Sequence, residues 1–237
     1  MVSNKPTNIA TQVNTTGSAN TAPKESTVYK PRFHQREWDV KHGKSTLKEN
    51  TTGASNTGMG ENALSFNTTG SNNTALGASA LYSNKSNIGS TAVGHLSMYY
   101  ADNRTTGRTT GNTAIGYESL KGSSTPANNT GLYNTAVGYQ TILSNTSGTQ
   151  NSAFGYGALI NNSTGSYNTA SGFVSLGQNT TGIDNTAYGT NSLQNNTIGN
   201  SNLGIGNGAG RNNTTGSNNT AVGSYDVLRN NTTGSNN

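Results

Sequence analysis

The residues that could catalyse a reaction or hold a metal ion are few and scattered in this sequence. Its 237 residues include nine Asp or Glu, three His and no Cys, so disulfide and thiolate chemistry is excluded. The histidines, His34, His42 and His95, lack the ligand spacing of a zinc site. Within the repetitive part of the chain, no paired spacing for acid–base catalysis is found among the carboxylates Glu61, Asp102, Glu118, Asp184 and Asp226. We therefore expect a protein that is not an enzyme and that uses no metal or other cofactor.

Residues 1–50 form a chemically distinct segment, which we expect to attach the chain to a partner protein. The segment holds eight Lys or Arg and four Asp or Glu, a net charge of +4, whereas residues 51–237 hold six and five. Aromatic and Arg side chains are typical interface anchors, and the candidates here are Tyr29, Arg32, Phe33, Arg36 and Trp38. The alternative is a short cap over the first repeat. Nucleic-acid binding is disfavoured, because the charges are mixed and the net charge is small.

A second group of aromatic and charged residues lies between residues 95 and 138. Aromatic rings beside polar groups are suited to contact with a carbohydrate or a protein. The candidate receptor contacts are Tyr99, Tyr100, Asp102, Arg104, Arg108, Lys121 and Tyr133. The alternative is a surface loop that binds nothing.

The composition restricts the kind of structure that could position these residues. Only 29% of the chain is hydrophobic and 10% is charged, whereas globular domains average about half and a quarter. Disordered chains are rich in Glu, Lys and Pro, but here Pro is 4 and charge is scarce. A repeat protein that gains its order from stacking fits both observations.

One pattern recurs ten times: Asn, Thr or Ser, Ala, an apolar residue and then Gly. The closing glycines are 60, 77, 94, 116, 138, 155, 172, 189, 206 and 223, so the period is 17 with five residues added twice. The additions fall between Gly94 and Gly116 and between Gly116 and Gly138, where the candidate receptor contacts lie. Insertions in solenoids emerge as loops on one side. Four residues after each closing Gly the residue is apolar in nine units of ten, from Leu64 to Val227.

These features predict an all-β fold, a parallel β-solenoid (β-roll) with coils of about 17 residues spanning residues 51–237. Thr-Ala-Val-Gly-Tyr is typical of a short strand bounded by turns, and the second apolar position predicts another short strand in each coil. Coils about 4.8 Å apart would make ten repeats into a rod of about 50 Å. The chain stops within a further unit, so we expect the shaft to continue beyond Asn237.

Stacking brings like residues into columns. We expect a hydrogen-bonded ladder of side-chain amides, built from Asn73, Asn112, Asn134, Asn151, Asn168, Asn185, Asn202 and Asn219, with Asn56 in the same phase and Ser90 the exception. The position two before each closing Gly is only Ala or Gly, which implies close approach of the backbone. Since each coil offers only about two large apolar side chains, we expect companion chains to cover the rest, in an intertwined homotrimer; the alternative is a monomeric solenoid.

The repeat NTAVGYQTIL resembles the head repeat of YadA-like trimeric autotransporter adhesins, with Thr135, Ala136, Val137 and Gly138 at the core positions. The resemblance covers about residues 50–237 and implies a left-handed parallel β-roll of three intertwined chains, displayed on a surface and used for attachment. Similar repeats occur in fibre proteins of bacteriophages and large DNA viruses. The family's repeat is shorter, near fourteen residues.

We expect a fibre or spike subunit of a virus or bacteriophage, at the virion surface, that attaches to a host carbohydrate or protein. Residues 1–50 would dock on a capsid or tail protein. The sequence shows no secretory signal and no apolar run long enough to span a membrane, which favours this reading over its first alternative, a bacterial cell-surface adhesin. The second alternative is an ice-binding solenoid that uses the Thr column, although the 22-residue units are expected to interrupt such a face. Asn-x-Ser/Thr sequons, such as those at Asn67, Asn145, Asn179 and Asn213, are expected by chance in an Asn/Thr-rich repeat.

Overall fold

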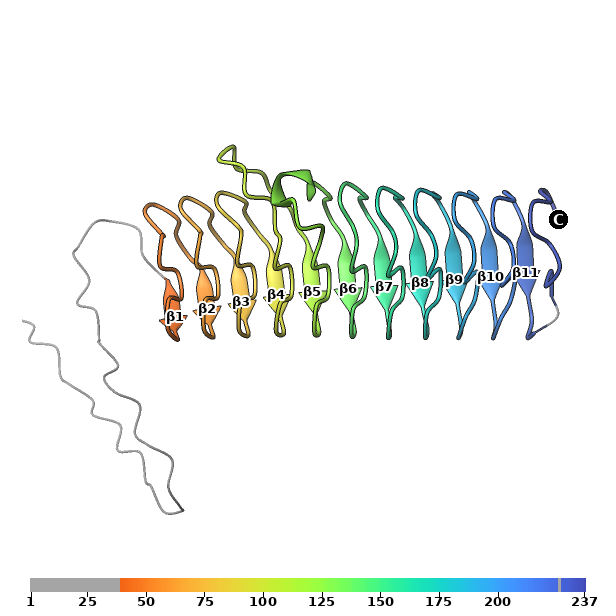
Figure 1. The fold of residues 1–237 in the computed structure, drawn as a ribbon, viewed down its shortest axis with the longest axis horizontal. Coiled ribbons are helices and arrows are strands. Elements are labelled where there is room, and N and C mark those ends of the chain that lie inside the picture. Colours follow the sequence, from red (N-terminus) through yellow and green to blue (C-terminus); the bar gives the residue numbers. More distant parts are fainter. Residues whose placement is uncertain (1–38, 226) are drawn as a thin grey trace, which may run out of the picture. The chain divides into compact units, whose positions relative to one another are not determined.

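The computed structural model describes residues 39–225 and 227–237, and these form a parallel β-solenoid wound from a single chain (Figure 1). Each coil contributes one three-residue strand, and the strands pair in chain order to form one sheet of 11 strands. The strands are β1 (Val40–His42), β2 (Thr57–Met59), β3 (Thr74–Leu76), β4 (Thr91–Val93), β5 (Thr113–Ile115), β6 (Thr135–Val137), β7 (Ser152–Phe154), β8 (Thr169–Ser171), β9 (Thr186–Tyr188), β10 (Leu203–Ile205) and β11 (Thr220–Val222). A single 3-10 turn, η1 (Pro126–Asn128), is the only helical element of the described residues. The predicted all-β solenoid is confirmed.

The solenoid begins one coil earlier than residue 51, where the sequence pattern placed its start. Strand β1 pairs with β2 in the same parallel register as every later pair. Asp39 takes the place of the ladder Asn in this coil and accepts hydrogen bonds from Asn50 Nδ2 and from the backbone N–H of Asn56, both at 2.7 Å. Sequence reasoning missed this coil because Asp39-Val-Lys-His-Gly43 shares little but its Gly with the later units. The predicted anchors Tyr29, Arg32, Phe33, Arg36 and Trp38 lie outside the described residues.

The strands alternate between the interior and the surface, as the two-residue period of a β-strand requires. From β2 onward the middle residue, Ala in most coils, is buried, while the flanking Thr and apolar residue point outward; in β1 all three residues are exposed. The apolar residue of the Thr-Ala-Val-Gly motif is therefore a surface residue.

Only one strand forms in each coil, so the prediction of a second strand is wrong. The second apolar position lies in a run of turns. Just after Gly60, the backbone N–H groups of Ala63, Ser65 and Asn67 donate to the carbonyls three residues earlier. Asn62 and Leu64 have φ values of 59° and 51°, the left-handed conformation found at the third position of a type II turn. These turns still bond between coils, because Leu64 N–H donates to Ala80 O at 3.0 Å.

The turn residue that follows the strand must be Gly for two reasons. At Gly138 the backbone φ is +137°, which residues with a Cβ atom rarely adopt. A Cβ atom there would also lie 2.3 Å from the carbonyl oxygen of Gly155 in the next coil. The same approach recurs at each closing Gly from Gly43 to Gly206, so this column sets how closely the coils stack.

The interior is a thin core enclosed by the chain itself. Columns of Ala and Leu, such as Ala136 and Leu159, are fully buried without any companion chain. Small residues beside the Leu column bond to the backbone of the next coil, as Ser119 Oγ does to Ala136 O at 2.9 Å. In the last coil the chain gains one residue, so that Leu228 and not Val227 takes the left-handed Leu position, with φ 52°.

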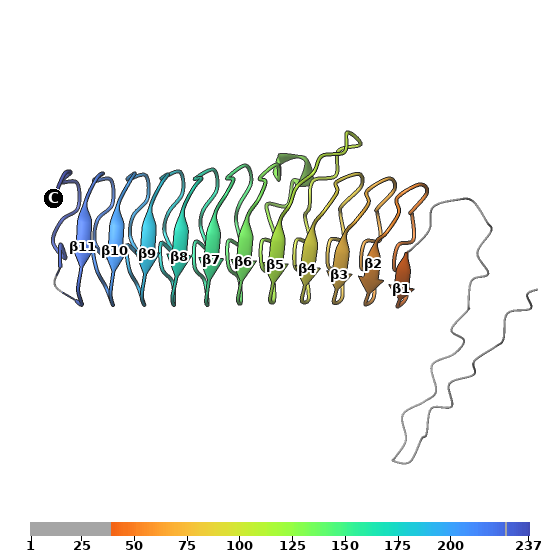
Figure 2. The ribbon, with the colours of Figure 1, turned by 180° about the vertical axis from the view of Figure 1, so that it is seen from behind.

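The two insertions do not disturb the strand register. Thr91 pairs with Thr113, and Thr113 with Thr135, as if no residues had been added. The added residues, which lie between β4 and β6 along the chain, instead rise from the edge of the coils away from the strands (Figures 1 and 2). The prediction that the 22-residue units interrupt the Thr face is therefore wrong.

Candidate functional site

The insertions that carry the candidate receptor contacts are braced against each other. Arg108 of the first insertion donates through Nη1 to Thr130 O of the second at 3.1 Å. Asn129 of the second donates through Nδ2 to Tyr100 O of the first. The two insertions therefore form one cross-linked protrusion.

Asp102 is the internal anchor of this protrusion and is only 2% exposed. Its carboxylate accepts hydrogen bonds from Arg104 Nη2 at 2.6 Å and from Arg108 Nη2 at 2.8 Å. Burial acts to raise the pKa of Asp102, but the hydrogen bonds from Arg104 and Arg108 outweigh it and hold the pKa below its usual value. Of the predicted receptor contacts, Asp102 is therefore buried inside the protein, and Arg104 and Arg108 are both hydrogen-bonded to Asp102.

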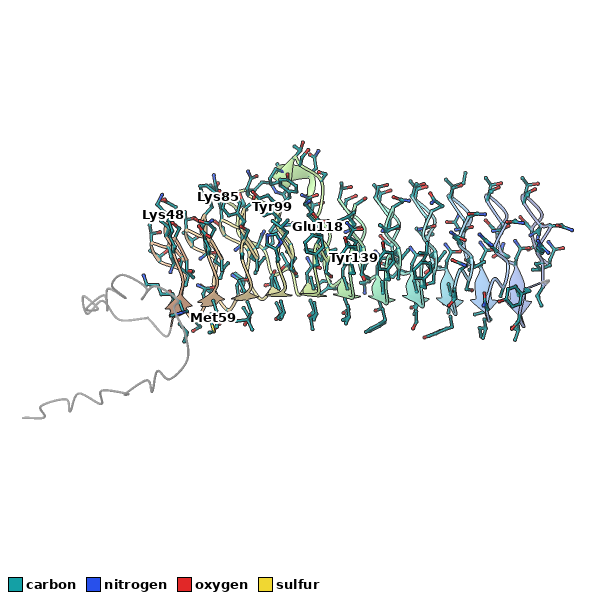
Figure 3. All side chains as sticks on the ribbon, turned by 60° about the horizontal axis from the view of Figure 1, so that its bottom comes forward. Lys48, Met59, Lys85, Tyr99, Glu118 and Tyr139 are labelled. Carbon is teal, nitrogen blue, oxygen red and sulfur yellow. The ribbon has the colours of Figure 1, made fainter. Side chains whose placement is uncertain are left out.

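The other predicted contacts lie around this centre. Lys121 Nζ lies 2.6 Å from Glu118 Oε1 and 6.0 Å from the centre of the Tyr100 ring, and the bond to Glu118 raises the pKa of Lys121. Tyr99 stacks on Tyr82 with ring centres 4.9 Å apart, and lies on the same side as Lys85 (Figure 3). Tyr133 is 55% exposed, so it is the most open of the seven.

The predicted Asn ladder is present, and its rungs are almost fully buried. Asn151 donates both its backbone N–H and its Nδ2 to Asn134 Oδ1, each at 3.0 Å, and donates Nδ2 also to Gly165 O at 2.9 Å. The ladder breaks where the pattern has Ser90, whose hydroxyl bonds to Thr110 instead. This ladder satisfies the polar groups at the corner before each strand.

A second Asn ladder, which sequence reasoning missed, runs beside the first. Its rungs lie seven residues after the closing Gly, or eight in the last coil with its extra residue: Asn50, Asn67 and Asn84, then Asn145, Asn162, Asn179, Asn196, Asn213 and Asn231. Within each stretch, every rung after the first donates Nδ2 to the rung before it and, in most coils, to a Gly carbonyl three residues on, as Asn179 does to Gly182 O at 3.0 Å. The fixed distance from the closing Gly was the signal that could have revealed it.

The four sequons noted in the sequence have their Asn residues in this second ladder. Asn67 and Asn179 are completely buried, and Asn145 and Asn213 almost so. Their Nδ2 atoms are hydrogen-bonded inside the solenoid. An N-linked glycan on any of the four is incompatible with the folded coil.

A strip of exposed apolar and aromatic residues, which we call the outer strip, follows the strand edge of the solenoid. One column is the third residue of each strand, including Met59, Ile115, Phe154 and Tyr188 at 40–47% exposure. Met59 points away from the ribbon on this side (Figure 3). The second column lies just past the closing Gly and contains His95, Tyr117, Tyr139, Tyr156 and Phe173.

The rings of the second column stack on each other along the solenoid. The centres of Tyr139 and Tyr156 are 5.1 Å apart and the rings are parallel within 1°. Because neighbouring rings cover each other's faces, a sugar cannot stack on an inner ring of this column. The outer strip therefore presents ring edges and aliphatic groups, which suits contact with another protein surface.

The described residues hold no cluster of His, Asp or Glu that could bind a metal ion. No helix among them is long and apolar enough to cross a membrane. An open hollow of about 310 Å³ lies at the C-terminal coils, beside Asn191, Asn207, Arg211 and Tyr225. Its polar groups are already partnered in part, since Asn207 Nδ2 donates to Tyr225 Oη at 3.0 Å.

The fold places the chain in the class of single-chain parallel β-solenoids. A scan against protein-family models found no match, and neither did searches of curated proteins and of solved structures. The resemblance to adhesin head repeats thus stays a prediction from the sequence.

Proposed function

We propose that this chain is a structural subunit of a virus or bacteriophage fibre or spike, in which the solenoid acts as a stiff shaft. Residues 1–50 attach it to a capsid or tail protein, and the braced protrusion at the insertions contacts the host surface. Several weak contacts presented by one particle then add up through avidity. The mechanism needs no catalytic group.

The observation that carries the proposal is the outer strip. An apolar surface that follows the solenoid over many coils is expected to be covered in the assembled particle. A second and third copy of the chain carry the same columns with the same spacing, so a homotrimer covers the strip with matching partners. The Ala, Leu and Asn columns need no such cover, because the single chain already buries them.

Mass measurement in solution tests the trimer. We expect the full chain to have about three times its own mass of 24.4 kDa by light scattering. Changing Phe154 and Tyr156 together to Glu should give a folded monomer. Tyr167→Glu is the control, because Tyr167 is at least as exposed as Phe154 and Tyr156 but does not belong to the outer strip. A wild-type monomer at micromolar concentration would contradict the trimer.

Imaging tests the location. Antibody labelling of intact particles should place the chain on projecting fibres of a virion. Labelling of a bacterial cell surface instead would support the adhesin alternative.

Ice binding is a second candidate because the Thr column runs past both insertions, although Ser152 and Leu203 replace Thr in two later coils. The strand register carries Thr57, Thr74, Thr91, Thr113 and Thr135 past both insertions. The outer strip beside it varies from Ser171 to Tyr188, which makes the face uneven. A thermal-hysteresis measurement decides: activity that Thr113→Tyr and Thr135→Tyr abolish would favour ice binding over the fibre.

A further inference from the structure

The second Asn ladder has a gap beneath the two insertions. Asn84 ends the first stretch, and Asn145 begins the next one three coils later. In the first intervening coil the rung position is Ala101, whose backbone N–H donates to Met98 O as that of Asn84 does to Leu81 O. The backbone is therefore in place for a rung, but the side chain lacks the amide.

Two buried amide oxygens are left without partners at this gap. They are Asn84 Oδ1 and Asn87 Oδ1, in side chains that are 0% and 2% exposed. An unpaired buried acceptor costs about 1–3 kcal/mol, so such groups are normally satisfied by protein or by ordered water.

Turning the amides round does not resolve the problem. Asn84 Nδ2 donates to Asn67 Oδ1 at 2.8 Å, and Asn87 Nδ2 donates to Asp102 O at 3.0 Å. A flip of either side chain would place an amide nitrogen on the cavity side and set an oxygen against these acceptors. The bonds of the two nitrogens therefore fix the oxygen as the atom of each amide that is left without a partner.

A cavity of about 30 Å³ lies in the gap and is lined by Asn84, Asn87, Ala101, Asp102 and Asn145, among others. That is room for one or at most two water molecules. Asn145 Nδ2 donates to Gly148 O, whereas Asn162 one coil later donates to both Gly165 O and Asn145 Oδ1. The cavity lining thus includes two amide side chains whose oxygens lack a donor, and the amide of Asn145, whose nitrogen makes one hydrogen bond fewer than that of Asn162.

We propose that this cavity is a binding site for a structural water molecule, which donates one hydrogen to Asn84 Oδ1 and the other to Asn87 Oδ1. A metal cation is the competing guest for two amide oxygens. The charged groups beside the cavity are Asp102, Arg104 and Arg108, a net charge of +1, which disfavours a cation. Water supplies the two donors without adding charge.

The site explains why Asn87 is tolerated where other coils have Gly. At the equivalent Gly70, a Cβ atom would lie 2.5 Å from the backbone oxygen of Asn87 in the next coil. After Asn87 the next coil is diverted into the first insertion, and the space becomes the cavity. The water joins the ladder to the base of the protrusion, because Asn87 also binds Asp102 O.

A crystal structure of the full chain, grown once with sodium and once with rubidium salts, tests the proposal directly. We expect the same water density within hydrogen-bonding distance of both oxygens in each crystal. Anomalous signal from rubidium at that place, an empty cavity, or amides turned with nitrogen toward the cavity would each overturn it.

A matched pair of variants tests the role of the missing rung. Ala101→Asn supplies the amide that other coils have, so it should displace the water and leave the unfolding midpoint unchanged or higher. Ala101→Leu fills similar space without a donor, so it should lower the midpoint by about 2–8 °C. Equal midpoints for the two variants would show that the two oxygens need no donor, contrary to the proposal.

Discussion

Asn202 donates both its backbone N–H and its Nδ2 to the single side-chain oxygen of Asn185, at 3.0 and 3.1 Å. The relationship repeats from coil to coil, so one side-chain oxygen satisfies a backbone group and a side-chain group of its neighbour. In a core this thin, these bonds replace much of what apolar burial does in a globular domain.

Removing one rung should therefore destabilise the solenoid more than its small size implies. Asn168→Ala leaves the backbone N–H of Asn185 without its acceptor and opens a cavity, so we expect a loss of about 3 kcal/mol in the free energy of unfolding. Chemical denaturation measures it. Asn161→Ala is the control, since its exposed side chain bonds only to Gln178 and its loss should stay within about 0.5 kcal/mol. Equal losses would mean that the ladder contributes little.

The column of closing glycines should not tolerate even a methyl group. Gly138→Ala places Cβ against Gly155 O in a left-handed backbone, and we expect a loss of about 2–5 kcal/mol. Gly157→Ala also has positive φ, +61°, but its Cβ would meet nothing closer than 3.6 Å. That variant should cost about 1–2 kcal/mol, the backbone effect alone. Thermal unfolding of both variants checks the difference, and a milder effect at Gly138 would refute the close approach of the coils.

Much of the fold could be predicted because the closing glycines recur at a regular spacing that sets the length of each coil. The strand Thr-Ala-Val, the buried Ala column and the first Asn ladder all follow from residues that keep phase. The turns could not be predicted, because Leu64 and Ile142 adopt left-handed backbones that their side chains disfavour and only stacked neighbours enforce. The buried state of Asp102 depends on two Arg residues that bend back from the insertion, for which the repeat gives no template.

Acid should weaken the protein over a defined pH range. The pKa values of Asp102 and Glu118 are lowered from ordinary values of 3.8 and 4.5, so the folded state holds fewer protons than the unfolded state in this range. The stability from both groups is complete above about pH 5 and is lost as the pH falls below 4. Unfolding midpoints measured between pH 3 and 8 should show this.

The variant Asp102→Asn shows how much of this loss of stability in acid comes from Asp102. It should lower stability by about 2 kcal/mol at pH 7 and reduce the fall in acid, because the Arg pair no longer faces a carboxylate. Arg104→Ala is the milder companion, since that side chain is 43% exposed and Arg108 remains in place. An unchanged acid slope in Asp102→Asn would assign the effect to other carboxylates.

Expression through a secretory pathway should leave the second ladder unmodified. Asn67, Asn145, Asn179 and Asn213 are sequon residues whose amides are bonded inside the coil, so glycans there would block folding. The sequon at Asn230 is the control, because that residue is exposed. Mass spectrometry of the folded, secreted chain should find any glycan at Asn230 and none at the four ladder positions.

The strand sheet keeps its pairing while the opposite side of the coil takes up five extra residues twice. The paired strands that hold the solenoid together and the loops that vary in length therefore lie on different sides of each coil. New recognition loops could be grafted at other turns of the winding, or existing ones exchanged, without redesigning the spine that carries them.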